Sequence, residues 1–164
     1  MLKARPLTVL DDNGKLTQDT IDVLEVIAEG DIILAGGHLS IDEMRPMFAE
    51  AKRRGVKKMI VNHPTYVIGC SDEDIRDLVG LGVKMEHSIC MFVEGRAHKY
   101  GPDKLAHLIE VAGVDNTLLC SDLGLQGSPR PVDGYLSIVG TLLDLQFGEK
   151  DIRKLVGKNA AQLL

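Results

Sequence analysis

The chain has 164 residues, of which 45% are hydrophobic and 26% are charged, and it contains no tryptophan. This composition is typical of one globular domain and excludes collagen, coiled coils and intrinsically disordered chains. The formal net charge is −5 and no lysine or arginine stripe is present, so we expect no nucleic-acid partner.

Cysteine usage and the absence of long apolar runs bear on the cellular compartment. Cys70, Cys90 and Cys120 are odd in number and widely spaced, which predicts reduced thiols rather than a disulfide framework. Residues 1–6 lack the apolar core of a signal peptide, and no run is long enough to span a bilayer. We therefore expect a cytoplasmic protein with no membrane partner.

The predicted elements begin with a short strand and an Asn13-Gly14 turn in residues 7–16, a pattern typical of a hairpin. Capping residues, glycines and apolar periodicity then predict helices over 17–30, 40–55, 71–82, 102–113 and 133–147, with a shorter one over 149–156. Ser40 and Glu43 form a capping box, and Asp133 is the expected N-cap of the long helix. Short, β-branched or apolar segments predict buried strands over 31–35, 57–62, 83–86 and 116–120.

Buried strands that alternate with helices require a parallel sheet, because parallel neighbours cannot be joined by tight turns. The sequence therefore predicts an α/β fold with about four parallel β/α units. We expect a single domain over residues 1–164, made of an N-terminal strand or hairpin segment (1–16) and the β/α units with C-terminal helices (17–164).

Histidine or aspartate follows each of the four predicted strands. The four residues are His38, His63, His87 and Asp122. The carboxyl ends of parallel strands lie at one edge of a sheet, so we expect these side chains to share one polar site. Imidazoles and a carboxylate suit Zn²⁺, Mn²⁺ or Fe²⁺, and a metal bound in this way activates water. For His87, the pattern leaves open whether it binds the metal or orients the substrate.

Two neighbouring features are predicted to be structural. Glu86 is expected to point to the side of its strand opposite His87, as a structural or supporting carboxylate. Cys120 ends an apolar strand, which indicates a packed thiol rather than a nucleophile.

The strand-end motifs and the end of the chain form a recognisable set: Gly36-Gly37-His38-Leu39-Ser40, Asn62-His63-Pro64, Glu86-His87-Ser88, Ser121-Asp122-Leu123-Gly124 and Gly157-Lys158-Asn159-Ala160-Ala161-Gln162-Leu163-Leu164. From about residue 17 onward, this set resembles the C-terminal half of amidohydrolase-superfamily metal-dependent hydrolases. The superfamily fold is a TIM barrel with metal-binding histidines after the fifth and sixth strands and an aspartate after the eighth. The resemblance implies His38, His63 and Asp122 as metal ligands, with Asp122 also the general base.

The chain departs from this family in its first half. It contains no His-x-His pair, and its 164 residues fall short of the roughly 250 of an eight-stranded barrel. We therefore expect a partial, half TIM-like barrel, either natural or the product of a truncated gene. Unpaired edges and an apolar inner face would favour a homodimer that completes the barrel, or an oligomer of such dimers. An alternative is a flattened sheet that is covered by the N-terminal segment.

The leading functional hypothesis is a metal-dependent hydrolase that acts on a small ester, amide or lactone. It would use one divalent ion held by His38, His63 and Asp122, with His87 as a further ligand or catalytic residue. A decarboxylase or isomerase would use the same ligands. The alternative from another class is a non-catalytic truncated barrel that serves as an oligomerising or small-molecule-binding module. A third hypothesis, an interrupted gene product, predicts poor solubility.

Overall fold

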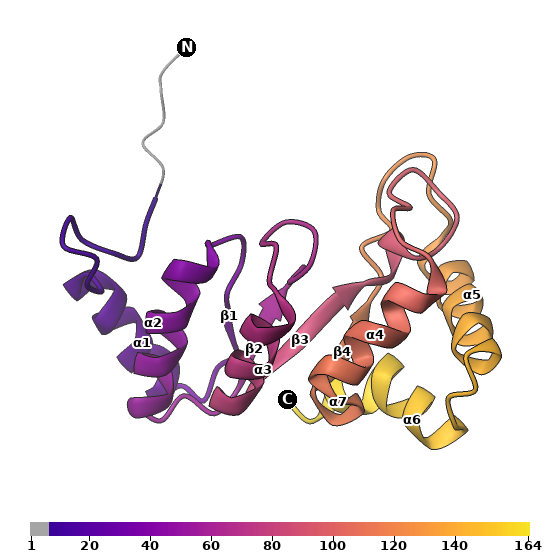
Figure 1. The fold of residues 1–164 in the computed structure, drawn as a ribbon. Coiled ribbons are helices and arrows are strands. Elements are labelled where there is room, and N and C mark those ends of the chain that lie inside the picture. Colours follow the sequence, from indigo (N-terminus) through magenta and orange to yellow (C-terminus); the bar gives the residue numbers. More distant parts are fainter. Residues whose placement is uncertain (1–6) are drawn as a thin grey trace, which may run out of the picture.

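Four strands form one sheet in which every pair of neighbours is parallel, in the order β1-β2-β3-β4 (Figure 1). The computed structural model describes residues 7–164, so the first six residues of the predicted N-terminal segment lie outside the described range. The strands are β1 (Leu34–Ala35), β2 (Met59–Asn62), β3 (Val83–Ser88) and β4 (Thr117–Cys120). The predicted α/β class and parallel sheet are confirmed.

Helices alternate with the strands as the apolar periodicity predicts. The longer helices are α1 (Gln18–Glu29), α2 (Ile41–Arg53), α3 (Asp72–Leu81), α4 (Pro102–Ala112) and α5 (Pro131–Asp144). The shorter ones are η1 (Ile89–Met91), η2 (Val114–Asn116), α6 (Glu149–Arg153), the π-helical η3 (Lys154–Lys158) and α7 (Asn159–Ala161).

Helix starts follow capping chemistry, with one correction. The predicted capping box is present, since the Glu43 carboxylate accepts a hydrogen bond from Ser40 N at 3.1 Å. The prediction that Asp133 caps α5 was wrong. The helix begins at Pro131, whose fixed φ suits the first helical position, and Arg130 is the N-cap.

Two N-terminal elements are shorter than predicted. The hairpin of residues 7–16 is a tight turn closed by a single antiparallel bridge between Leu10 and Leu16. The strand predicted over 31–35 pairs with β2 only at Leu34 and Ala35.

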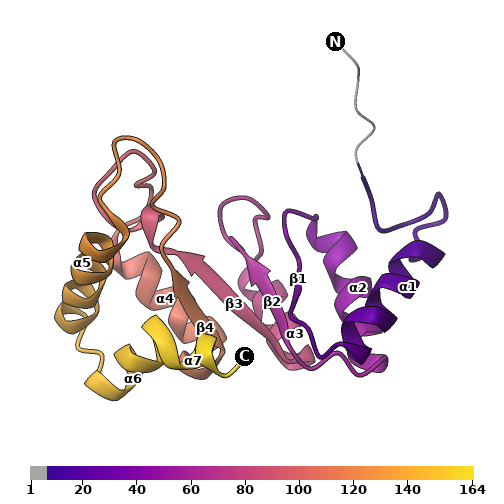
Figure 2. The same cartoon turned by 180° about the vertical axis from the view of Figure 1, so that it is seen from behind.

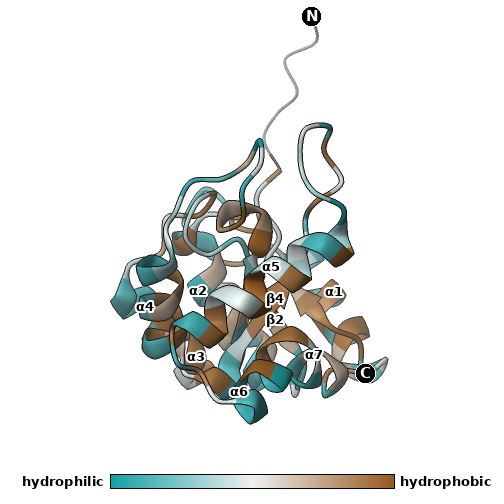
Figure 3. Cartoon of the chain, turned by 90° about the vertical axis from the view of Figure 1, so that its right-hand side faces the viewer, coloured by the Kyte–Doolittle hydropathy of each residue, from teal (hydrophilic) through white to brown (hydrophobic). Residues whose placement is uncertain are grey.

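The two faces of the sheet have different surroundings. Val61, Val83 and Met85 point to the face covered by α2, α3 and α4, and they are fully buried. The alternate residues Ile60 and Glu86 point to the other face and are only half-buried. Figure 2 shows this second face directly, with α7 lying beside β4. The π-helical η3 also contacts β4, and α6 contacts η3 and α5. In the side view of Figure 3, the ribbons of β2 and β4 have the brown colour of hydrophobic residues.

Gly134 allows α5 to pack against the segment that follows β4. A Cβ atom at Gly134 would lie 2.1 Å from Leu123 Cδ1, and Leu123 is itself buried. We expect Gly134→Ala to lower the free energy of unfolding by about 1–3 kcal/mol, because the steric cost outweighs the helix propensity of alanine. Chemical denaturation measures the change.

Gly140 provides the matched control for this prediction. It lies in the same helix, and no atom is within 4 Å of an added Cβ. Gly140→Ala should raise the free energy of unfolding by up to about 1 kcal/mol. Equal stabilisation by both substitutions would contradict the packing role of Gly134.

No helix within residues 7–164 combines the length and the apolar character that crossing a bilayer requires.

Candidate functional site

A pocket of about 300 Å³ lies where the loops after the strands come together. Its lining residues are His38, His63, Tyr66, Val67, Cys90, Met91, Ala97, Lys99, Asp122 and Leu125. The loops after β2, β3 and β4 rise from the same end of the sheet (Figure 1). Three of the four residues predicted to share one site, His38, His63 and Asp122, therefore line one pocket.

The backbone turns sharply as the chain leaves the strands. His63 and Asp122, which come one and two residues after β2 and β4, have φ values of 51° and 49°. Non-glycine residues adopt this left-handed conformation rarely, and where it occurs it is concentrated at functional sites. His38 follows Gly37, whose φ is 59°. These turns carry the three side chains off the sheet and into the pocket.

The two pocket histidines lie close enough to each other to bind the same metal ion. The ring centres of His38 and His63 are 5.4 Å apart, with an interplanar angle of 50°. Two imidazoles on one tetrahedral zinc, with Zn–N distances of about 2.0–2.1 Å, have ring centres about 5 Å apart. The histidine pair therefore fits one metal ion. Within residues 7–164, no three His, Cys, Asp or Glu side chains are grouped closely enough to form a complete ligand set.

Asp122 is held by a neighbouring thiol. Cys90 Sγ donates to Asp122 Oδ2 at 3.6 Å. Burial raises the pKa of the Cys90 thiol to about 11, and the negative charge of Asp122 acts in the same direction. Cys90 therefore stays protonated near neutral pH and serves as a donor rather than as a nucleophile.

The structure separates His87 from the pocket, which corrects the prediction that it shares the site. Strand β3 continues through Ser88 instead of ending at residue 86, so His87 lies within the strand. Strand alternation places it on the helix-covered face with Val83 and Met85, where it is 1% exposed. Neither ring nitrogen has a hydrogen-bond partner among the described residues. Burial lowers the pKa of His87 to about 4, and the positive charge of Lys104 acts in the same direction.

The contact between Ser88 and His63 was not predicted from the sequence. Because β3 is longer, Ser88 lies on the open face with Glu86, and its hydroxyl is 2.8 Å from His63 Nδ1. Continuing the two-residue alternation past Glu86 would have indicated this placement. The expected orientation of Glu86, opposite His87, is confirmed, since its carboxylate contacts Asn62 and Cys120.

Cys120 behaves as the predicted packed thiol. Burial raises its pKa to about 12, and its hydrogen bond to the Glu86 carboxylate adds to the rise. The thiol therefore keeps its proton near neutral pH.

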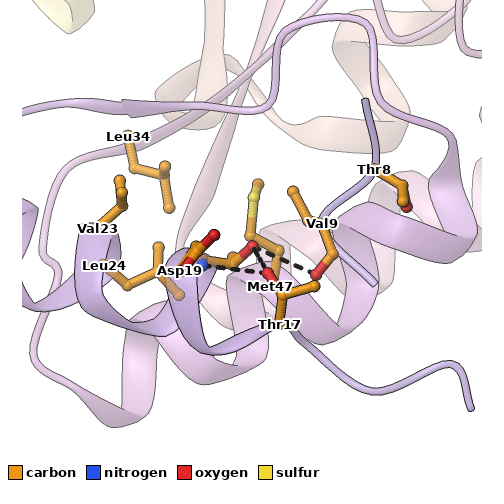
Figure 4. A pocket seen from close by; sticks show the side chains of 9 residues that line it. Thr8, Val9, Thr17, Asp19, Val23, Leu24, Leu34 and Met47 are labelled. Carbon is orange, nitrogen blue, oxygen red and sulfur yellow. Dashed lines mark hydrogen bonds between the residues drawn. The ribbon is translucent and has the colours of Figure 1, made fainter. Parts of the chain in front are cut away.

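A second pocket, of about 380 Å³, lies between the N-terminal turn, α1 and α2 (Figure 4). Its lining is mainly apolar, with Val23, Leu24 and Met47 among the contributors. The hydroxyls of Thr17 and Thr20 lie 2.8 Å apart, so they are engaged with each other. The lining of this pocket includes none of the histidines that line the first pocket, and it consists mainly of apolar packing surface.

Comparison with known proteins gives one family match. The model of a family of unknown function (DUF6282) matches residues 2–86. The matched segment carries His38 and His63 and ends before Asp122. No curated protein matches the chain.

Proposed function

The chain belongs to the DUF6282 family, a family of unknown function, and from the chemistry of its pocket we propose that it is a divalent-metal-dependent hydrolase. The observation that carries the proposal is the approach of His38 and His63 to each other in a pocket that Asp122 also lines. Two imidazoles and a carboxylate are ligands that Zn²⁺, Mn²⁺ and Fe²⁺ accept. The resemblance of the strand-end motifs to amidohydrolases points to the same chemistry.

In the proposed reaction, His38, His63 and Asp122 would hold one ion. When bound, a divalent ion polarises a substrate carbonyl and makes water more acidic. Asp122 accepts the proton of the attacking water. One carboxylate oxygen of Asp122 would hold the ion and the other would take the proton, with Cys90 donating to Oδ2 in either case. Substrates of this chemistry are small esters, amides or lactones.

The other lining residues favour a substrate with an apolar body and an anionic group. Val67, Met91 and Leu125 provide apolar surface. Among the described residues that line the pocket, only Lys99 is a lysine or arginine, and its Nζ lies 3.9 Å from the centre of the Tyr66 ring. A substrate carboxylate would pair with this ammonium.

We expect Lys99→Met to raise KM about 10- to 150-fold for 4-nitrophenyl hydrogen glutarate, because a charge-assisted hydrogen bond is worth about 1.5–3 kcal/mol. KM for the neutral 4-nitrophenyl pentanoate should not change. Lys57→Met is the matched control, since Lys57 is exposed near the opposite end of the sheet, before β2 begins. Equal changes in KM for both esters would rule out an anion-binding role for Lys99.

The proposed partner of the open sheet face is a second copy of the chain. β1 and β4 are the edges, and all strands are parallel, so a two-fold axis along the strands would set β4 of each copy beside β1 of the other. The result is eight strands, the number in a TIM barrel. The open face carries a hollow of about 480 Å³, and α5 exposes Val132, Leu136 and Leu143. Sedimentation equilibrium should give twice the chain mass of 17.9 kDa, and a monomer would contradict the proposal.

A second candidate function is a non-catalytic, small-molecule-binding module. The observation in its favour is that no three metal-binding side chains are grouped together within the described residues. In that case the pocket binds small anions without turnover.

Hydrolysis assays separate the two candidates. The full chain is treated with a chelator, then supplied with Zn²⁺, Mn²⁺ or Fe²⁺ and assayed on 4-nitrophenyl esters, lactones and anilides. We expect turnover with metal and none after chelation. A lack of turnover with every metal and substrate would contradict the hydrolase and favour the binding module.

A further inference from the structure

The side chains of His63, Ser88 and Cys120 connect the pocket to the Glu86 carboxylate on the open face of the sheet. His63 Nδ1 contacts Ser88 Oγ at 2.8 Å, and Ser88 Oγ lies 3.5 Å from Cys120 Sγ. Cys120 Sγ lies 3.0 Å from Glu86 Oε1. Asn62 Nδ2 donates to the other carboxylate oxygen, Oε2, at 3.0 Å. The sheet register supports these contacts, because Ser88 pairs with Cys120 and Asn62 pairs with Glu86 across neighbouring strands.

Only one set of directions makes all three contacts from His63 to Glu86 hydrogen bonds at once, given the number of protons that each group has. The ionised Glu86 can only accept, so Cys120 donates its S–H to Oε1. Cys120 has then used its one proton, and its sulfur accepts the O–H of Ser88. Ser88 has also used its one proton, so its oxygen accepts from His63. The proton of the neutral imidazole therefore lies on Nδ1.

We propose that Glu86 acts through Cys120 and Ser88 as a positioning residue that fixes His63 in its Nδ1–H tautomer and leaves the Nε2 lone pair for the pocket. A metal ion binds only a ring nitrogen that carries no proton, so Nε2 is the ligand atom. This consequence for a metal rests on the proposed function, whereas the tautomer itself does not.

Burial strengthens this arrangement. Ser88 is 1% exposed, so water does not compete readily for its hydroxyl, and hydrogen bonds strengthen where the local dielectric constant is low. Reversing the direction of these hydrogen bonds would require a donor at the position of Glu86 Oε1.

Glu86→Gln supplies that donor. With Asn62 Nδ2 directed at residue 86 as in the wild type, the glutamine oxygen faces Asn62 and the glutamine NH₂ group faces Cys120. Cys120 then donates to Ser88, Ser88 donates to His63 Nδ1, and the imidazole proton moves to Nε2. Glu110→Gln is the matched control, because Glu110 is an exposed residue on α4.

The test uses the full chain labelled with ¹⁵N-histidine, freed of metal by a chelator and kept at about pH 8, above the ordinary pKa of imidazole. Long-range ¹H–¹⁵N correlation spectra distinguish protonated from bare ring nitrogens, and the signals lost in His63→Gln assign His63. We expect a bare Nε2 in the wild type and in Glu110→Gln, and a bare Nδ1 in Glu86→Gln.

A bare Nδ1 in the wild type would overturn the inference, and so would an unchanged tautomer in Glu86→Gln. If Glu86→Gln does not fold, Ser88→Ala gives the second test, because it removes the acceptor for Nδ1–H and should shift the proton toward Nε2. An unchanged tautomer in Ser88→Ala would also overturn the inference. A confirmed tautomer in a chain that binds no metal would count against the proposed function alone.

Discussion

His63→Ala and Asp122→Asn are each expected to lower kcat/KM for ester hydrolysis by about 10²–10⁴-fold, the range for loss of an acid–base group. The first substitution removes one of two imidazoles whose ring centres are 5.4 Å apart, and the second removes the carboxylate that we propose as the acceptor of the proton of water. Steady-state kinetics with saturating metal measures both effects.

The control for these variants is His98→Ala. His98 is an exposed residue between η1 and α4 and is not among the residues that line the pocket. The kcat/KM of His98→Ala should equal that of the wild type. The melting temperatures of all three variants should remain close to the wild-type melting temperature. Full activity in either His63→Ala or Asp122→Asn would exclude the assigned roles.

Acidification should destabilise the protein through His87. Its pKa is about 4 in the folded chain, against an ordinary value of 6.5. Below pH 6.5 the unfolded chain takes up a proton that the folded chain does not, so the free energy of unfolding falls as the pH drops. The loss is complete near pH 4 and amounts to about 3 kcal/mol, at about 1.4 kcal/mol for each pH unit.

His87→Leu tests this cause directly. The substitution removes two buried ring nitrogens that have no partner among the described residues, so stability near neutral pH should equal or exceed that of the wild type. The free energy of unfolding, measured by denaturation at pH values between 4 and 6.5, should lose the part of its pH dependence that comes from His87. The same slope in the wild type and in His87→Leu would assign the acid sensitivity to other groups.

The elements were predictable because local signals agree with the fold. The apolar positions of α2 and the box formed by Ser40 and Glu43 identify that helix, and β-branched or apolar runs identify β2 and β4. Parallel strands then require their carboxyl ends to share one edge. This rule alone was sufficient to place His38, His63 and Asp122 around one pocket.

The interior of the site was less predictable because it depends on where β3 ends. The sequence pattern predicted that this strand ends at Glu86, but the strand extends to Ser88. Two more residues of regular strand send His87 to the helix-covered face and bring Ser88 to His63. The contact between Ser88 and Cys120 also depends on cross-strand register, which residues 88 and 120 alone do not encode.

Metal binding by the purified full chain is the most direct test of the account. Equilibrium dialysis against Zn²⁺ followed by elemental analysis should give one ion per chain for the wild type and for His98→Ala. It should give a large loss of bound ion for His38→Ala, His63→Ala and Asp122→Ala. Zinc that is absent from the wild type, or retained by all three variants, would contradict the assignment of this pocket as a metal centre.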